Sequence, residues 1–295
     1  MVTHMSETAR IITSYGLRYI VRSETGHVYE ATTRKKRVDF ACGDRVHIRP
    51  QNSEQAVIED YLPRDSLLYR QDAWKTKLIA ANVDRLFIVT AAVPSPSEML
   101  LQRALLAAEA GHIEPFIVLN KTDLPQSDGW REKLAFYTRL GYPVVEVCAL
   151  DNAAALQPLL SGHTSIFLGQ SGMGKSTLTN ALLGEERART GDLSSALDSG
   201  KHTTTHAQLY DLDDLAPDTY LIDSPGLQEF GLHHLDAPDL LHYFPDMRHL
   251  IGQCRFHNCT HRQEPGCAVK AAAEQGSIRP ERLAFLQRIS DELLR

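Results

Sequence analysis

The sequence has no long uninterrupted apolar run. No stretch approaches the roughly eighteen apolar residues of a membrane-spanning helix, and Met1–Arg10 is not followed by the apolar run that a signal peptide needs. No internal repeat or low-complexity segment is present, and 43% of the 295 residues are hydrophobic, which excludes extensive disorder and a coiled coil. We therefore expect a soluble cytoplasmic protein of two or three domains with no membrane partner.

Cysteine is scarce, with five residues in the whole chain. Cys42 and Cys148 stand alone, whereas the other three lie within residues 254–267. So few cysteines in so long a chain do not form a disulfide framework, and their local crowding is typical of a metal site.

Positive charge is not in excess, because the formal net charge is −6. A protein coated in positive charge for nucleic acid is therefore not expected. Residues 1–72 contain 11 basic and 10 acidic residues, residues 73–240 contain 12 and 21, and residues 241–295 contain 8 and 6. The two ends are thus the places where a polyanion could dock, helped by the basic run at 34–37, although such a run is also typical of a solvated turn.

Two hydrophobic periodicities divide the chain. From residue 11 to about residue 61, short segments alternate apolar and polar residues, which is typical of a small antiparallel barrel. From residue 83 onward, continuous apolar strands alternate with helical stretches, which predicts a parallel sheet covered on both faces. An amphipathic helix is predicted from about Pro280. We expect three domains, at 1–72, 73–240 and 241–295.

A phosphate-binding loop is predicted at Gly169–Ser176, between an apolar strand and a helix. Glycines allow successive backbone amides to point at a phosphate, and the helix N-terminus adds a favourable dipole. Lys175 is expected to reach the β- and γ-phosphates and Ser176 to ligate Mg²⁺. The predicted phosphate-site residues are Gly169, Gln170, Ser171, Gly172, Met173, Gly174, Lys175, Ser176 and Thr177.

The residues predicted to select the base follow another apolar strand. In the turn Asn120-Lys121-Thr122-Asp123, the Asp123 carboxylate can accept hydrogen bonds from the N1 and N2 hydrogens of guanine, and Lys121 can cover the ring. Cys148 and Ala149 end the next strand, where the Ala149 amide could meet the guanine carbonyl oxygen. A plain strand end is the alternative for that pair.

Two further segments complete a nucleotide switch. Asp223 follows a third strand and is expected to hold Mg²⁺ through water, and the Gly226 amide could sense the γ-phosphate. The polar segment 200–206 could supply a threonine hydroxyl to the metal; Thr204 is favoured, with Thr205 close behind. A threonine-rich loop without function is the alternative.

The order of these motifs is permuted. In ordinary GTPases the phosphate loop comes first and the guanine turn late, whereas here the turn at 120–123 precedes the loop at 169–176. The same sheet can be built with its chain cut elsewhere. The permutation leaves Asp223–Gly226 leading directly into the C-terminal segment. The conformation of that segment can therefore depend on the bound nucleotide.

That segment carries the predicted metal site. Three thiols and an imidazole lie close together in a pattern suited to one tetrahedral structural zinc ion. A catalytic thiol is the competing interpretation, but no general base is evidently paired with one. The predicted zinc ligands are Cys254, Cys259, His261 and Cys267.

Together these motifs resemble the RsgA family, the circularly permuted GTPases of small ribosomal subunit biogenesis. The resemblance covers nearly the whole chain and includes Asn82–Asp84, His202–Thr205 and Leu227–Phe230. It implies an N-terminal OB-fold, a central P-loop GTPase domain and a small, mainly helical zinc domain. It also implies GTP and GDP as ligands, the small (30S) subunit and its rRNA as partners, and hydrolysis stimulated by that subunit late in its maturation.

The sequence departs from that family at two positions. Cys148 stands where a serine is expected, a mild change because the guanine contact is made by the backbone there. Phe285 replaces a tyrosine expected in the last helix.

The glutamine that orients water in familiar GTPases is missing, because Leu227 follows Gly226. Intrinsic hydrolysis should therefore be slow. Our hypothesis is that His202 positions the attacking water once rRNA orders its segment, so the predicted catalytic residues are His202, Lys175 and Thr204.

Two functional interpretations remain open at this stage. The first is an enzyme that hydrolyses GTP to GDP and phosphate. The second is a module whose nucleotide site stabilises an RNA-docking scaffold. A permuted GTPase of the large subunit is disfavoured, because it would not need this barrel and cysteine cluster. A monomer is the preferred oligomeric state.

Overall fold

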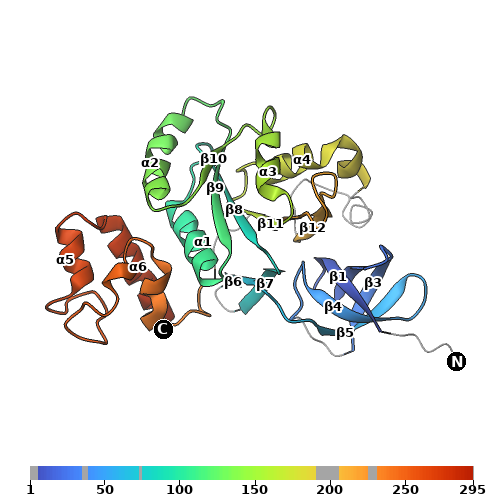
Figure 1. The fold of residues 1–295 in the computed structure, drawn as a ribbon, viewed down its shortest axis with the longest axis horizontal. Helices are drawn as coiled ribbons and strands as arrows, with labels where there is room; N and C mark the ends of the chain where they lie inside the picture. The colour runs from blue at the N-terminus through green and yellow to red at the C-terminus, as the bar shows by residue number, and fades with distance from the viewer. Residues whose placement is uncertain (1–5, 35–38, 73–74, 191–205, 225–230, 295) are drawn as a thin grey trace.

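The structure is a computed structural model that describes residues 6–34, 39–72, 75–190, 206–224 and 231–294. Along the chain it forms an N-terminal barrel, a central layered α/β region and a C-terminal helical region (Figure 1). The expected fold class is confirmed. In the part of the chain described, no helix combines the length and apolar character needed to cross a membrane.

The barrel has five strands whose side chains alternate between core and solvent. The neighbours β1-β2-β3-β5-β4 are hydrogen-bonded in that order, and β1 also pairs with β4, which closes the barrel. Apolar side chains such as Ile11, Val21 and Ile48 are fully buried inside it. The strands are β1 (Glu7–Ser14), β2 (Arg18–Ser23), β3 (Val28–Thr33), β4 (Arg45–Pro50) and β5 (Gln55–Tyr61).

The central sheet has strand order β10-β9-β8-β11-β13-β12, with every pair parallel except β12–β13. Its strands are buried on both faces, so their sequences are continuously apolar rather than alternating. They are β8 (Arg85–Ala91), β9 (Glu114–Asn120), β10 (Val144–Glu146), β11 (Thr164–Leu168), β12 (Gln208–Asp211) and β13 (Tyr220–Asp223).

Helices cover both faces of this sheet. Leu86 and Ile88 pack on one side with α1 (Glu98–Ala110) and α2 (Ser127–Arg139). Phe87 and Val89 pack on the other side with three further helical segments. These are the turn η1 (Ala153–Leu156), α3 (Gln157–Leu160) and α4 (Lys175–Thr190).

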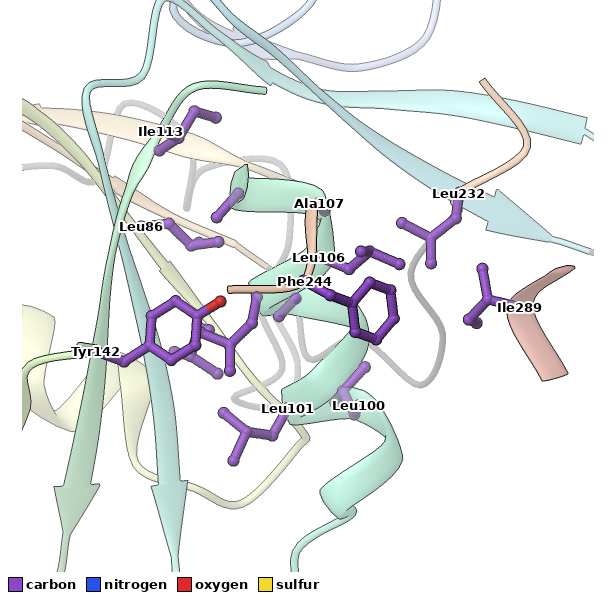
Figure 2. Close-up of a cluster of buried hydrophobic side chains, with 14 of the residues drawn as sticks. Leu86, Leu100, Leu101, Leu106, Ala107, Ile113, Tyr142, Leu232, Phe244 and Ile289 are labelled. Atoms are coloured by element: carbon purple, nitrogen blue, oxygen red, sulfur yellow. The ribbon is translucent and has the colours of Figure 1, made fainter. Parts of the chain in front are cut away.

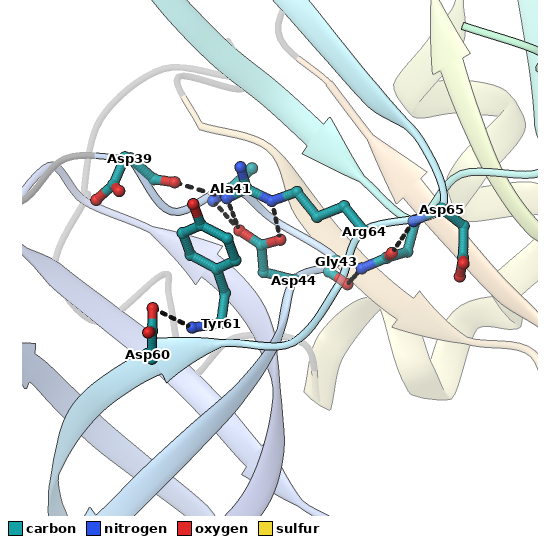
Figure 3. A network of polar contacts seen from close by, with 9 residues as sticks. Asp39, Ala41, Gly43, Asp44, Asp60, Tyr61, Arg64 and Asp65 are labelled. Atoms are coloured by element: carbon teal, nitrogen blue, oxygen red, sulfur yellow. Dashed lines mark hydrogen bonds and ion pairs between the residues drawn. The ribbon is translucent and has the colours of Figure 1, made fainter.

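The barrel joins the central sheet edge to edge. Thr13 of β1 pairs with Gln208 of β12, so one eleven-stranded sheet runs through both regions. The hairpin β6 (Leu67–Asp72) and β7 (Lys75–Ala81) lies at the same joint, and residue 72 is within it. Figure 3 shows the polar network there, in which Arg64 Nε donates to Asp44 Oδ1 at 2.6 Å.

The C-terminal region packs against α1. It comprises η4 (Ala237–Tyr243), η5 (Arg248–Leu250), α5 (Ala268–Glu274) and α6 (Pro280–Leu293). Figure 2 shows Phe244 and Ile289 directed into the cluster formed by α1 side chains. The buried Arg282 guanidinium donates to Asp246 at 2.8 and 3.0 Å and to Gln102 of α1 at 3.1 Å, so this contact is polar as well as apolar.

Candidate nucleotide site and metal centre

The predicted phosphate loop connects the carboxyl end of β11 to the N-terminus of α4. Gly174 has φ +92°, and a Cβ at that position would lie 2.3 Å from Asn120 Nδ2. A side chain there would therefore push the loop away from the guanine turn, which explains the glycine. The loop thus curls against the end of β9 with its amides at a helix N-terminus, the arrangement that binds anions.

Lys175 is buried within this loop. Its Nζ donates to the carbonyl oxygens of Gly169 and Gln170, each at 3.0 Å. Burial lowers the pKa of Lys175, an effect that the neighbouring Asp223 opposes. A partly desolvated ammonium group held at the phosphate loop is suited to bind a phosphate ligand.

Ser176 and Asp223 form the candidate magnesium site. Ser176 Oγ donates to Asp223 Oδ2 at 3.0 Å, and Asp223 is 3% exposed. A hydroxyl and a carboxylate beside a phosphate loop are the oxygen ligands that Mg²⁺ prefers. Ser224 Oγ donates to Phe167 O at 2.7 Å and so fixes the chain directly after Asp223. The donor set therefore fits the ion.

The guanine turn is tied to the phosphate loop by Asn120 and Lys121. Asn120 Nδ2 donates to Met173 O at 2.9 Å, while Asn120 Oδ1 accepts from the Ala149 amide at 3.1 Å. Lys121 Nζ donates to Gly172 O at 2.7 Å and to Val93 O at 2.9 Å. These bonds connect the chain beyond four strands, β8, β9, β10 and β11, at one edge of the sheet.

A cavity of about 300 Å³ lies between these elements. Its volume is at the lower end of the range for small-molecule sites. Asp123 lines it, so the carboxylate predicted to recognise guanine faces a space of suitable size. The other lining residues are Asn120, Lys121, Leu124, Cys148, Ala149, Leu150, Gly174 and Thr177.

Cys148 has a contact that the sequence did not reveal. Its Sγ donates to Asp123 Oδ1 at 3.4 Å, and its backbone amide donates to Asn152 Oδ1 at 2.6 Å. The side chain, as well as the backbone, therefore belongs to the guanine cavity.

The segment after β8 is a second element that sequence reasoning missed. Gln170 Oε1 accepts from the Ser97 amide at 2.6 Å, and Ser97 caps α1 by accepting from Leu100 N. A Cβ on Gly172 would lie 3.2 Å from Pro94. Its position in the sequence could have indicated this role. The segment follows the carboxyl end of a buried strand, β8, which pairs with β11, and ligands bind at the carboxyl ends of such strands.

Several predicted residues lie outside the described part of the chain. They are His202, Thr204 and Thr205 of the predicted first switch segment, Gly226 and Leu227 of the second, and Lys35–Arg37 of the basic run. Of the predicted phosphate and guanine residues, all from Asn120 to Asp223 are described, and they share one edge of the central sheet.

The four predicted zinc ligands lie together. Cys254, Cys259, His261 and Cys267 each place a ligand atom within 4.8 Å of the others. Cys254 Sγ lies 3.7 Å from His261 Nδ1 and 4.0 Å from Cys267 Sγ, close to the separations of about 3.5–3.8 Å between ligand atoms in a tetrahedral zinc site. Burial lowers the pKa of His261, which favours the neutral imidazole that a metal needs. The site fits one zinc ion.

Comparisons with known proteins agree with this geometry. The model of a family described as RsgA GTPase matches residues 61–233. The small ribosomal subunit biogenesis GTPase RsgA of Neisseria meningitidis is 74% identical over 98% of this chain and 93% of its own length, and that of Nitrosomonas europaea is 45% identical over 97% and 92%. The crystal structure of YjeQ from Thermotoga maritima superposes with a TM-score of 0.71 at 29% identity, covering 98% of this chain and 99% of its own. This chain is a GTPase that belongs to the RsgA family.

Proposed function

We propose that this GTPase acts in biogenesis of the small ribosomal subunit, hydrolysing GTP to GDP and phosphate when it binds the maturing particle. The observation that carries the proposal is the single sheet edge that holds the guanine cavity, Lys175 and the Ser176–Asp223 pair. The relatives that match nearly the whole chain bear the name of that process.

In this mechanism, the Asp123 carboxylate accepts the N1 and N2 hydrogens of guanine. Adenine lacks that donor pair and would leave the carboxylate unsatisfied. The loop amides and the Lys175 ammonium stabilise negative charge on the β- and γ-phosphates. Ser176, Asp223 through water, and Thr204 would hold Mg²⁺, which supplies further neutralisation of the phosphate oxygens when bound. His202 is proposed to position the attacking water.

The flanking regions are proposed to bind the ribosomal particle. The barrel, as an OB-fold, would contact rRNA by groove charge and stacking, and the cysteine-cluster region would bind from the other side of the nucleotide domain. Both regions carry slightly more basic than acidic residues, whereas residues 73–240 are acidic. The protein is proposed to act in the cytoplasm as a monomer with one structural zinc ion.

Phosphate release tests the proposal. We expect slow turnover with GTP alone and clear stimulation by small subunits, with no stimulation by large subunits. His202→Ala should keep GTP affinity and lose the stimulated rate. Stimulation by large subunits alone would contradict the proposed partner, and full stimulated turnover by His202→Ala would contradict the role of that residue.

The second candidate function is a nucleotide-stabilised RNA-docking module. Its distinguishing result would be subunit binding that depends on GTP while phosphate release stays at the rate of GTP alone. The Lys175 and Ser176–Asp223 arrangement favours the enzyme, because an ammonium group and magnesium ligands at the β- and γ-phosphates stabilise the charge that develops during phosphoryl transfer.

A further inference from the structure

Two histidines lie in the described chain shortly after the two predicted switch segments. His206 follows the segment predicted to carry Thr204, and His234 follows the segment predicted to carry Gly226. Each histidine ring lies against a tyrosine ring of the N-terminal region. The two contacts therefore connect the described chain next to each predicted switch segment to the N-terminal barrel and its neighbouring hairpin.

The first contact joins the barrel to the stem of β12. The Tyr15 and His206 rings meet edge to face, with centroids 4.8 Å apart. Beside them, Thr13 Oγ1 donates to Ala207 O at 2.9 Å. Arg22 of β2 pairs with Asp211 at the far end of β12. The chain from 206 to 211 is thus held against the barrel at both ends.

The second contact joins the hairpin to the chain after residue 230. The Tyr69 and His234 rings stack with centroids 4.4 Å apart and planes at 30°. Their neighbours Leu68 and Leu232 are each 1% exposed and belong to the same core cluster. Figure 2 shows Leu232 directed into that cluster beside the α1 side chains. Burial, and to a smaller extent His233, lowers the pKa of His234, which favours the neutral form of the stacked ring.

The barrel and hairpin that carry the two tyrosines are locked to each other. The Ala81 amide donates to Cys42 O at 2.9 Å, and a Cβ on Gly43 would lie 2.3 Å from Ala81 O. Asn82 donates to Gly43 O at 3.1 Å and accepts from the Asp65 amide at 3.0 Å. Because these close contacts leave no room for the barrel and the hairpin to move separately, Tyr15 and Tyr69 are expected to move together when a partner moves the barrel.

We propose that Tyr15 and Tyr69 are positioning residues for GTP hydrolysis. They hold the chain at His206 and His234, so a displaced N-terminal region would shift the described chain that adjoins each predicted switch segment, while the guanine cavity stays unchanged. The proposal rests on the proposed function, because it uses the predicted switch segments. A ribosomal particle that binds the barrel would thereby control hydrolysis through two ring contacts.

The test compares ring removal with ring retention. For Tyr15→Ala, Tyr69→Ala and the double variant, GTP turnover is measured with small subunits at saturating nucleotide. The KM for GTP and the affinity for GDP are measured as well. We expect kcat to fall about tenfold in each single variant and further in the double, with KM and GDP affinity within about twofold of wild type. Tyr15→Phe and Tyr69→Phe, which keep the rings, should retain the wild-type kcat.

His27→Ala is the matched control. His27 contacts Tyr29 with ring centroids 4.4 Å apart, and its ring also lies 2.6 Å from Ser53 O, so this histidine–tyrosine pair is internal to the barrel. Its loss should leave kcat unchanged. Turnover by the alanine variants within about twofold of wild type would overturn the proposal. Equal losses of kcat in His27→Ala would do the same, since they would show a general effect of the barrel.

Two further arms separate possible failures. If an alanine variant melts below the assay temperature, Tyr15→Leu or Tyr69→Leu replaces it, because leucine keeps apolar contact but not the ring. The kcat of each leucine variant should also fall about tenfold, and turnover within about twofold of wild type would again overturn the proposal. If wild-type protein itself shows no GTP turnover with small subunits, the proposed function fails; active wild type with unaffected variants overturns only the role of the tyrosines.

Discussion

The nucleotide site draws its residues from separate strand ends between Asn120 and Asp223, whereas the cysteine cluster takes all four side chains from residues 254–267. The first site exists only once a parallel sheet has brought those ends to one edge. The second is local in sequence and depends on a short loop. The nucleotide site thus depends on the tertiary fold of the sheet, whereas the cysteine cluster depends on local sequence.

This difference predicts where the stability of each site comes from. The nucleotide site is held by backbone carbonyls and amides, as in the bonds from Asn120 and Lys121 to the phosphate loop. The cysteine cluster has local supports of its own, such as the bond from Gln287 Nε2 to His261 O at 2.6 Å, and is expected to take further stability from the metal. Each site should therefore tolerate loss of the other's ligand.

Removal of zinc should give the largest effect. Chelation is expected to release one zinc ion per chain and to unfold the loop at 254–267, because structural zinc contributes on the order of 10 kcal/mol in small zinc domains. Atomic absorption and circular dichroism measure the two changes, with Cys259→Ser as the genetic equivalent and Cys148→Ser as its control. Parallel loss of GTP affinity would contradict the independence of the two sites.

Lys175→Ala should give the next largest effect. Loss of the ammonium group that faces the phosphates is expected to lower GTP turnover by about a thousandfold or more. Zinc content and melting temperature should stay at the wild-type values. Lys133→Ala, on the exposed face of α2, is the control. Turnover retained by Lys175→Ala would remove the phosphate loop from the mechanism.

Arg282→Ala removes part of the polar contact between the C-terminal region and α1 of the central region. It leaves the Asp246 carboxylate, whose side chain is 8% exposed, without its guanidinium partner, so we expect a loss of about 3 kcal/mol in unfolding free energy. Chemical denaturation measures it. Arg282→Met combined with Asp246→Leu should recover much of the loss, and a double variant as unstable as the single one would argue against the buried charge as its cause.

Cys148→Ser should give the smallest effect. Serine can make the same hydrogen bond to Asp123, so GTP affinity is expected to stay within about twofold of wild type. The thiol of the wild type should react with a maleimide more slowly when GTP is bound, because the cavity it lines would be filled. Labelling that GTP does not slow would place Cys148 outside the guanine site.

Much of the nucleotide site was predictable because each motif follows a buried strand. Gly169–Ser176 and Asn120–Asp123 could be placed at one sheet edge from the apolar runs alone, and the zinc ligands from their spacing. The helix predicted from about Pro280 is α6.

What could not be predicted are contacts between elements remote in sequence. β12 has only four residues and pairs with a strand almost two hundred positions earlier, so no local pattern reveals the continuous sheet. The bonds of Ser97 to Gln170 and of Arg282 to Asp246 depend on how helices settle on that sheet. A sequence periodicity shows which face is buried but not which distant side chain meets it.

Calorimetric titration with GTP and ATP tests the central claim most directly. With Asp123 facing the base and Lys175 the phosphates, GTP should bind at least about a hundredfold more tightly than ATP. Equal binding of the two nucleotides, or of neither, would contradict the account.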